Sequence, residues 1–253
     1  MRSDEREPLM SHIQELLLRL KRCLIYFMLA FGVGYALSED VLKFVMVPIH
    51  QFLPPGVKLV FTQPFEQVFV LMKMSVIIGV MISIPAFFAE IFFFLDRGLT
   101  GRESRRIWTT FVGAWLLALV GIAWSYFYLL PLILDIVMSY QSLDVSPVIS
   151  LSYYVNASLG LLLVGGLFFE IPFFMILASS WGWVPASFWS KQRRYAVVFN
   201  AVVSAVLSPP DLPSMLAMMI PIQVLYEIGY WGARIFSALR KPESEGAQSE
   251  VGS

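Results

Sequence analysis

Two acidic residues, Glu15 and Glu103, lie beside apolar runs in settings that suggest ligand binding. Glu15 precedes the first long apolar run, and Glu103 lies in the charged segment Leu99-Thr-Gly-Arg-Glu-Ser-Arg-Arg106. Each also has a purely structural interpretation. Glu15 can pair with Arg19 one helical turn on. Glu103 lies near the N-terminus of the next expected helix, where the helix dipole stabilises a carboxylate. If both lie at one membrane surface, they can bind a ligand with guanidinium groups, since carboxylate and guanidinium fit with two parallel hydrogen bonds.

Glu170 is unusual because it lies inside an apolar run, in Gly165-Gly-Leu-Phe-Phe-Glu-Ile-Pro172. A charged side chain at the centre of a membrane helix costs at least about 2.5 kcal/mol, so Glu170 must face protein or water. Pro172 removes a backbone hydrogen bond and should kink the helix nearby. Two interpretations are open: a protonated Glu170 hydrogen-bonded to a neighbouring helix, or a functional acid that lines a water-filled concavity, which we favour.

Asp211 ends the turn Ser208-Pro209-Pro210-Asp211, which joins the last two apolar runs. Its simplest role is to cap the helix that follows. Three methionines come next, and we interpret them as core or lipid-facing side chains, with a soft docking surface for a partner as the alternative. These residues are Met215, Met218 and Met219.

Other chemistries have no candidate residues in the sequence. The single cysteine, Cys23, cannot form an internal disulfide, and two histidines without a second cysteine argue against a zinc site. A net charge of zero gives no general attraction for nucleic acid. Because there is also no nucleotide motif and no Ser-His-Asp set, we expect neither enzymatic activity nor a cofactor.

The elements that position the acids are expected to be membrane-spanning helices. Hydrophobic residues make up 58% of the chain and charged residues only 14%, whereas soluble domains have about a quarter charged. A bilayer core about 30 Å thick needs about 20 apolar residues in a helix. The sequence therefore predicts an all-α polytopic membrane protein with six spans, at residues 20–37, 68–95, 107–134, 153–181, 195–207 and 214–231.

The fifth predicted span is too short to cross a bilayer at a rise of about 1.5 Å per residue. The proline turn before Asp211 leads directly into the sixth. These two shallow helices should therefore thin the bilayer locally or lie hidden against the other four. The first helix is expected to begin at Ser11, which can form a capping box with Gln14. Since no internal repeat is visible, we expect one domain at residues 1–236, followed by a polar, disordered cytoplasmic tail at 237–253.

The distribution of basic residues predicts that both termini face the cytoplasm. Of the 18 Lys and Arg residues, all except Lys43, Lys58 and Lys73 lie on the same side as the N-terminus in this topology. The long opposite connection, 38–66, is expected to open with a short amphipathic helix that starts at Ser38 and includes Pro48. A second external connection, 135–152, contains no Lys or Arg.

Over about residues 9–236 the sequence resembles the TatC family, the signal-receptor core subunit of the twin-arginine protein translocase. Each matching motif is weak alone, but together they follow the family's order and spacing. The motifs are His12-Ile-Gln-Glu15-Leu, Val47-Pro48-Ile, Leu99-x-x-x-Glu103, Tyr126-Phe-x-x-x-Pro131, Phe169-Glu170-Ile-Pro172, Arg194-Tyr195, Ser208-Pro-Pro-Asp211 and Ile220-Pro221-x-x-x-Leu-Tyr226-Glu227.

The resemblance implies a glove-shaped bundle in the inner membrane, with a concave face, in which Glu15 and Glu103 bind the paired arginines of a signal peptide. It also implies that Arg105 belongs to this site, that Glu170 polarises the concavity and that Pro48 belongs to an external cap. The short helices 5 and 6 would form the surface where single-span TatA and TatB partners dock, and folded cargo would cross on the proton-motive force. The residues expected at that surface are Ser208, Asp211, Met215 and Glu227.

Five positions depart from the family's usual residues. Leu17 replaces a common arginine, and Ser104 replaces a common basic residue. Glu90 takes the place of a common glutamine, and Arg97 that of a common proline. Met215 occupies a position usually held by glutamine. The first four concern the signal site, and the last concerns the contact with a partner helix.

Two other functions stay open as alternatives. A proton-coupled small-solute transporter with Glu170 as its carrier acid predicts solute flux in vesicles without any partner, and preferably an internal repeat. A passive membrane scaffold predicts that neutralising Glu15 or Glu103 changes nothing but stability.

Overall fold

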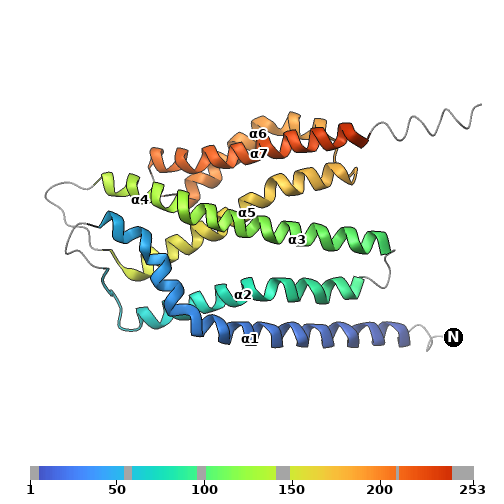
Figure 1. Ribbon diagram of the computed structural model, residues 1–253, viewed down its shortest axis with the longest axis horizontal. Coiled ribbons are helices and arrows are strands. Elements are labelled where there is room, and N and C mark those ends of the chain that lie inside the picture. The colour runs from blue at the N-terminus through green and yellow to red at the C-terminus, as the bar shows by residue number, and fades with distance from the viewer. Residues whose placement is uncertain (1–5, 54–58, 96–100, 141–148, 209–210, 241–253) are drawn as a thin grey trace, which may run out of the picture. The chain divides into compact units, whose positions relative to one another are not determined.

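The computed structural model describes residues 6–53, 59–95, 101–140, 149–208 and 211–240; for some helix-end residues, Glu103 among them, it describes only the backbone. Within these ranges the protein is all-helical apart from a single isolated bridge (Figure 1). The helices are α1 (Arg6–Phe52), α2 (Glu66–Leu95), α3 (Gly101–Trp124), the π-helical η2 (Ser125–Leu129), α4 (Leu130–Ser139), α5 (Leu151–Ser180), α6 (Ala186–Leu207) and α7 (Leu212–Arg240).

Four stretches of helix in the described residues are long and apolar enough to cross a membrane. They are Glu66–Phe93, Ile107–Ser139, Leu151–Ser180 and Leu212–Ile235. These coincide with four of the six predicted spans and confirm the all-α, multi-pass class. The other two predicted spans, 20–37 and 195–207, lie within α1 and α6, which are not among the four. The count of six spans therefore stays a prediction.

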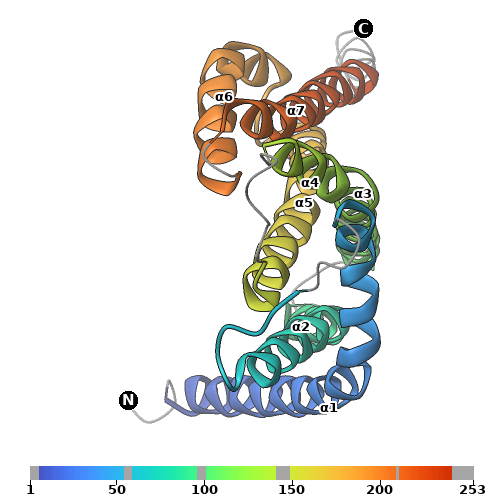
Figure 2. The same ribbon diagram turned by 90° about the vertical axis from the view of Figure 1, so that its left-hand side faces the viewer.

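The first helix is longer than the sequence indicated at both ends. It begins at Arg6, so the expected start at Ser11 is wrong. It also continues through Ser38 to Phe52, so the expected separate helix from Ser38 is wrong as well. The Ser38 hydroxyl donates to the carbonyl of Tyr35 at 2.7 Å, which means that it bonds back into the same helix and does not cap a new one. Instead of breaking, α1 bends, and its second part runs at a steep angle to its first (Figures 1 and 2).

The described residues fall into two compact units. The first holds α1 as far as His50, α2, α3 as far as Trp115, and the start of α5 up to Asn156. The second holds the last two residues of α1, the rest of α3, η2, α4, the rest of α5, α6 and α7.

In the first unit, small residues let α1 and α2 approach closely. A Cβ on Gly34 would lie 2.7 Å from the carbonyl oxygen of Ser75, and one on Gly79 would lie 3.0 Å from the Cα of Phe31. Two glycines on facing helices therefore set the crossing of α1 and α2, and this crossing brings the start of α1 to the end of α2.

The opposite end of the first unit is held by the carboxylate of Glu66, which is 3% exposed. Glu66 accepts hydrogen bonds from the Ser150 hydroxyl at 2.7 Å and from the Ser152 backbone N–H at 2.6 Å, as well as from the backbone and hydroxyl of Thr62 and the backbone of Gln63. The carboxylate thereby ties the segment before α2 to the start of α5.

In the second unit, α3 and α5 also meet at glycines. A Cβ on Gly121 would lie 2.7 Å from the carbonyl oxygen of Gly165. The helix then widens into η2, where the Leu130 N–H bonds to the Ser125 carbonyl five residues back. Pro131 follows directly and has no N–H to donate to the carbonyl four residues back, which fits a local change in the helix ladder.

The last two helices form a hairpin in which α6 packs against α7 (Figure 2). The turn before α6 contains Gly182 at φ 82°, a conformation that favours glycine. The N–H groups of Gly182 and Trp183 bond to the carbonyls of Ser179 and Ala178, which closes the end of α5. Helix α7 ends at Arg240, four residues beyond the boundary expected for the polar tail, and residues 241–253 lie outside the described ranges.

Candidate functional site

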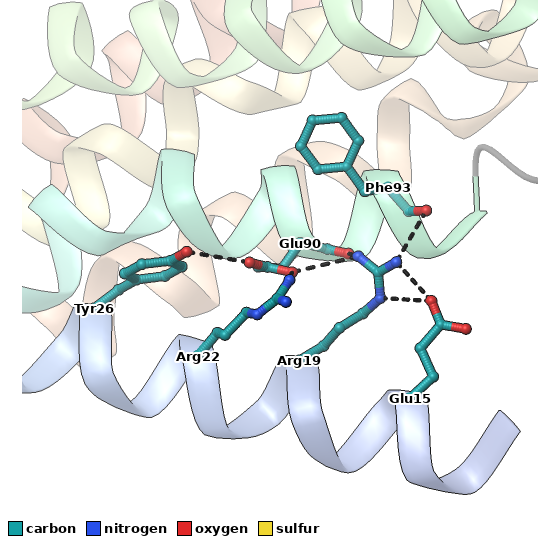
Figure 3. A network of polar contacts seen from close by, with 6 residues as sticks. All are labelled: Glu15, Arg19, Arg22, Tyr26, Glu90 and Phe93. Carbon is teal, nitrogen blue, oxygen red and sulfur yellow. Dashed lines mark hydrogen bonds and ion pairs between the residues drawn. The ribbon is translucent and has the colours of Figure 1, made fainter. Parts of the chain in front are cut away.

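The start of α1 and the end of α2 together hold a guanidinium group (Figure 3). The Arg19 Nε and Nη2 atoms donate to the Glu15 carboxylate at 3.2 and 2.7 Å. Its Nη1 donates to the Glu90 carboxylate at 3.3 Å and to the Glu90 carbonyl at 3.0 Å, and Nη2 also donates to the Phe93 carbonyl at 3.3 Å. A guanidinium has five N–H donors, so these contacts supply one acceptor for each.

Glu90 is the centre of a second set of contacts. The Tyr26 hydroxyl donates to Glu90 at 3.2 Å, and the Arg22 guanidinium forms an ion pair with it at 3.7 Å. The side chain of Glu90 is only 10% exposed and that of Arg19 14%, whereas that of Arg22 is 60% exposed. Since charges shielded from water interact more strongly, the inner ion pair should contribute more than the outer one.

The end of α2 favours a cation for a further reason. Its last carbonyls have no partner within the helix, and the helix dipole makes this end negative. The last turn of α2 contains no basic residue of its own. Arg19 of α1 therefore provides the positive charge that this helix end lacks.

The ion pair borders an open groove. Arg19 and Glu90 both line an open groove of about 890 Å³ between α1 and α2. The rest of its lining is mainly apolar, with Leu20, Leu24 and Phe87 among it, and it also includes Lys21.

The contacts of the three predicted signal-site residues, Glu15, Glu103 and Arg105, are described to different extents. The pairing of Glu15 with Arg19, its structural interpretation, is confirmed. Glu103 lies in the first turn of α3, but its side chain is outside the described part, so its distance from Glu15 is not described. Arg105 is exposed on α3, and its carbonyl accepts the Thr109 hydroxyl at 3.1 Å. Their role in binding a ligand stays a prediction.

The participation of Glu90 was missed by the sequence analysis, which noted it only as a departure from the family. A signal was present, because Glu90 is an acid near the end of an apolar run, where a side chain can still reach a polar partner. The sequence could not show which basic residue faces it, since this depends on how α1 crosses α2.

Glu170 lies in α5, two residues before Pro172, and is 9% exposed. Within the described residues neither carboxyl oxygen has a hydrogen-bond partner of ordinary geometry, although the backbone of Ala118 on α3 is close enough to interact. The hydrogen bond to a neighbouring helix that the first interpretation expects is therefore not decided by these contacts. A role in a water-filled concavity stays a prediction.

The predicted partner surface includes structural contacts of its own. Asp211 accepts the Ser214 N–H at 2.7 Å, which confirms that it caps α7. Ser208 is buried at the end of α6, and Met215 is half-buried. Glu227 of α7 forms an ion pair with Arg193 of α6. A groove of about 690 Å³ runs along α7 and is lined by Met219, Ile220, Gln223, Val224 and Glu227, among others.

Pro48 is buried in the second part of α1. Nearby, the Tyr154 hydroxyl at the start of α5 donates to the Val45 carbonyl at 2.7 Å. Val45, Pro48 and Tyr154 all belong to the first unit.

Comparison with known proteins gives a consistent result. A family model described as Sec-independent protein translocase protein (TatC) matches residues 11–221. The chain is 28% identical over 246 residues to a Sec-independent protein translocase protein TatC of Desulforapulum autotrophicum, covering 97% of this chain and 91% of the relative. It is 30% identical over 233 residues to that of Haemophilus influenzae, covering 92% and 91%.

A solved structure, a crystal structure of the twin arginine translocase receptor TatC, also matches. Its TM-score is 0.74 at 27% identity, and the match covers 89% of this chain and 99% of the other.

Proposed function

The chain belongs to the TatC family of Sec-independent protein translocase proteins, and on this basis we propose that Glu15 and Glu103, with Arg105, bind the paired arginines of a signal peptide. The protein is a multi-pass inner-membrane protein and a core subunit of the twin-arginine translocation system, which exports folded proteins. The proposal concerns how its residues recognise the signal.

The observation that carries the proposal is the way in which Glu15 holds a guanidinium. The Glu15 carboxylate accepts two N–H groups of Arg19, at 2.7 and 3.2 Å. The Glu15 side chain is 19% exposed. An arginine from a peptide presents the same planar fork, whereas lysine presents a point charge. A second carboxylate at Glu103 would take the second arginine, and the exposed Arg105 would lie beside it.

We propose that both termini face the cytoplasm and that α1 and α6 supply the two remaining spans. The distribution of Lys and Arg supports this orientation. The signal site would then lie on the cytoplasmic side, where an exported protein is made.

For the partners, we propose that single-span TatA- and TatB-like proteins dock on the α6–α7 hairpin near Ser208, Asp211, Met215 and Glu227. The groove along α7 supports this, because its lining is apolar except for Gln223 and Glu227. A partner's membrane helix with one polar residue would fit this groove, because its apolar face would pack on the apolar lining and its polar residue would pair with Gln223 or Glu227. Transport would use the proton-motive force, and Glu170 would keep the interior of the membrane domain polar.

The test is binding of a fluorescent signal peptide with Arg-Arg, and of its Lys-Lys twin, to the full-length protein in detergent. We expect a clear Arg-Arg preference that disappears in the double variant Glu15→Gln, Glu103→Gln. Asp40→Asn is the matched control, because Asp40 lies on the same helix, is 74% exposed and pairs only with Lys43 among the ion pairs described. Unchanged affinity in the double variant would refute the proposal. Solute flux in vesicles without a partner would favour the transporter alternative with Glu170.

A further inference from the structure

We propose that Glu90 and Glu15 together form the binding site for one arginine of the signal, and that Arg19 occupies this site until the signal's guanidinium replaces it. The inference rests on the proposed function, since it requires Glu15 to bind the signal. It adds Glu90 as a binding residue and Arg19 as an internal competitor.

The geometry of the site is complete for a guanidinium (Figure 3). The acceptors are the carboxylates of Glu15 and Glu90 and the carbonyls of Glu90 and Phe93. They come from two helices and approach the group from several sides. A lysine ammonium has three donors on one atom, so it cannot reach acceptors spread over this width.

The two carboxylates also explain why the site holds a cation before any ligand arrives. Glu15 and Glu90 both contact Arg19, and without a positive charge between them they would repel each other. Arg19 therefore compensates the charge of both carboxylates until a ligand arrives. An incoming guanidinium would inherit the same acceptors, so the site would lose no hydrogen bond in the exchange.

The surroundings allow such an exchange. Arg19 and Glu90 line the open groove of about 890 Å³, whose mainly apolar walls can take the aliphatic part of a peptide arginine while Arg19 turns away. Arg22, one turn further along α1, shows that an arginine in this region can stay 60% exposed while near Glu90.

Internal competition gives a physical reason for a pair of arginines. Arg19 is attached to the site and so has a high effective concentration there, which a single peptide arginine would not overcome easily. A second arginine bound at Glu103 would hold the peptide in place while the first displaces Arg19. Recognition would then need both arginines.

Binding of the Arg-Arg and Lys-Lys peptides to full-length variants tests the inference. Arg19→Gln removes the competitor, and we expect Arg-Arg affinity to rise on the order of tenfold, with little change for Lys-Lys. Arg19→Lys keeps the positive charge but lacks the planar guanidinium. Its affinity for the Arg-Arg peptide should lie between those of Arg19→Gln and the wild type. Lys43→Gln is the matched control, because it removes one positive charge from an exposed ion pair on the same helix.

Glu90→Gln should be made in the Arg19→Gln background. In the wild type, Glu90 stabilises both bound Arg19 and the bound peptide arginine. Loss of Glu90 would therefore weaken both, and the net change in peptide affinity would be small. In the Arg19→Gln background, the added Glu90→Gln change should lower Arg-Arg affinity on the order of tenfold and leave Lys-Lys affinity nearly unchanged. Thermal unfolding of each variant would show that the changes in affinity do not come from loss of fold.

Two outcomes would overturn the inference. If Arg19→Gln weakens Arg-Arg binding, then Arg19 positions Glu15 and does not compete. If Glu90→Gln has no effect in the Arg19→Gln background, then Glu90 does not bind the ligand. In both cases the proposed function stands if the variant of Glu15 and Glu103 still loses the Arg-Arg preference, and it fails with the inference if that variant binds as the wild type does.

Discussion

At the residue scale, the ion pairs of this protein differ in how far they are removed from water. Asp40 and Lys43 are each 74% exposed, so their pair should contribute little to stability. Arg19 is 14% exposed and has two carboxylates around it, so loss of one partner would leave a shielded charge poorly compensated. The position of a charged pair therefore matters more than the number of such pairs.

Glu66 gives a residue-scale prediction that is independent of signal binding. Glu66→Gln should lower the midpoint of thermal unfolding in detergent by several degrees. The reason is that the carboxylate accepts hydrogen bonds from Thr62, Gln63, Ser150 and Ser152, and an amide would turn an NH₂ group toward some of these donors. Asp40→Asn serves as the control, and equal midpoints for the two variants would contradict the role given to Glu66.

At the element scale, close approach of helices at glycine gives a second prediction. Gly121→Ala should destabilise the protein by about 1–3 kcal/mol, because the new methyl group would press on the Gly165 backbone and force α3 and α5 apart.

Gly160→Ala is the matched control for this prediction. A Cβ there meets nothing within 4 Å, although Gly160 lies on the same helix, α5, as Gly165. It should be neutral or slightly stabilising, since alanine favours a helix more than glycine does. Chemical denaturation in detergent would compare the two, and equal stability would contradict the packing argument.

The elements also show what the sequence could predict and what it could not. Long apolar runs predicted α2, α5 and α7 because their length must match the bilayer. Ser38 looked like a helix start, but its hydroxyl can equally bond backwards into its own helix, and in the structure it does so. The π-helical η2 was not predicted, although Pro131 was a signal for irregular hydrogen bonding.

The candidate site was predicted only in part, for a similar reason. Glu15 and its pairing with Arg19 follow from local spacing along one helix. The contacts of Glu90 and the Phe93 carbonyl with Arg19 depend on which faces of α1 and α2 meet, and no local pattern determines this.

At the scale of the whole molecule, the proposed topology predicts the sides on which two exposed residues lie. Cys23 is the only cysteine, so a Cys23→Ser background permits single-cysteine variants. Tyr140→Cys, after α4, should react with an impermeant maleimide from outside intact cells. Trp183→Cys, between α5 and α6, should react only after the membrane is opened. Labelling of both from the same side would contradict the six-span topology.

The central claim, that carboxylates at the start of α1 and at Glu103 read a twin-arginine signal, is tested most directly by photo-crosslinking. A signal peptide with a photoreactive residue beside its arginine pair would be bound to the full-length protein, and the attached peptide fragments would be identified by mass spectrometry. The account predicts crosslinks in α1 around Glu15 and in the first turn of α3 around Glu103, suppressed by excess Arg-Arg peptide but not by its Lys-Lys twin. Crosslinks confined to α6 and α7, or equal competition by both peptides, would contradict it.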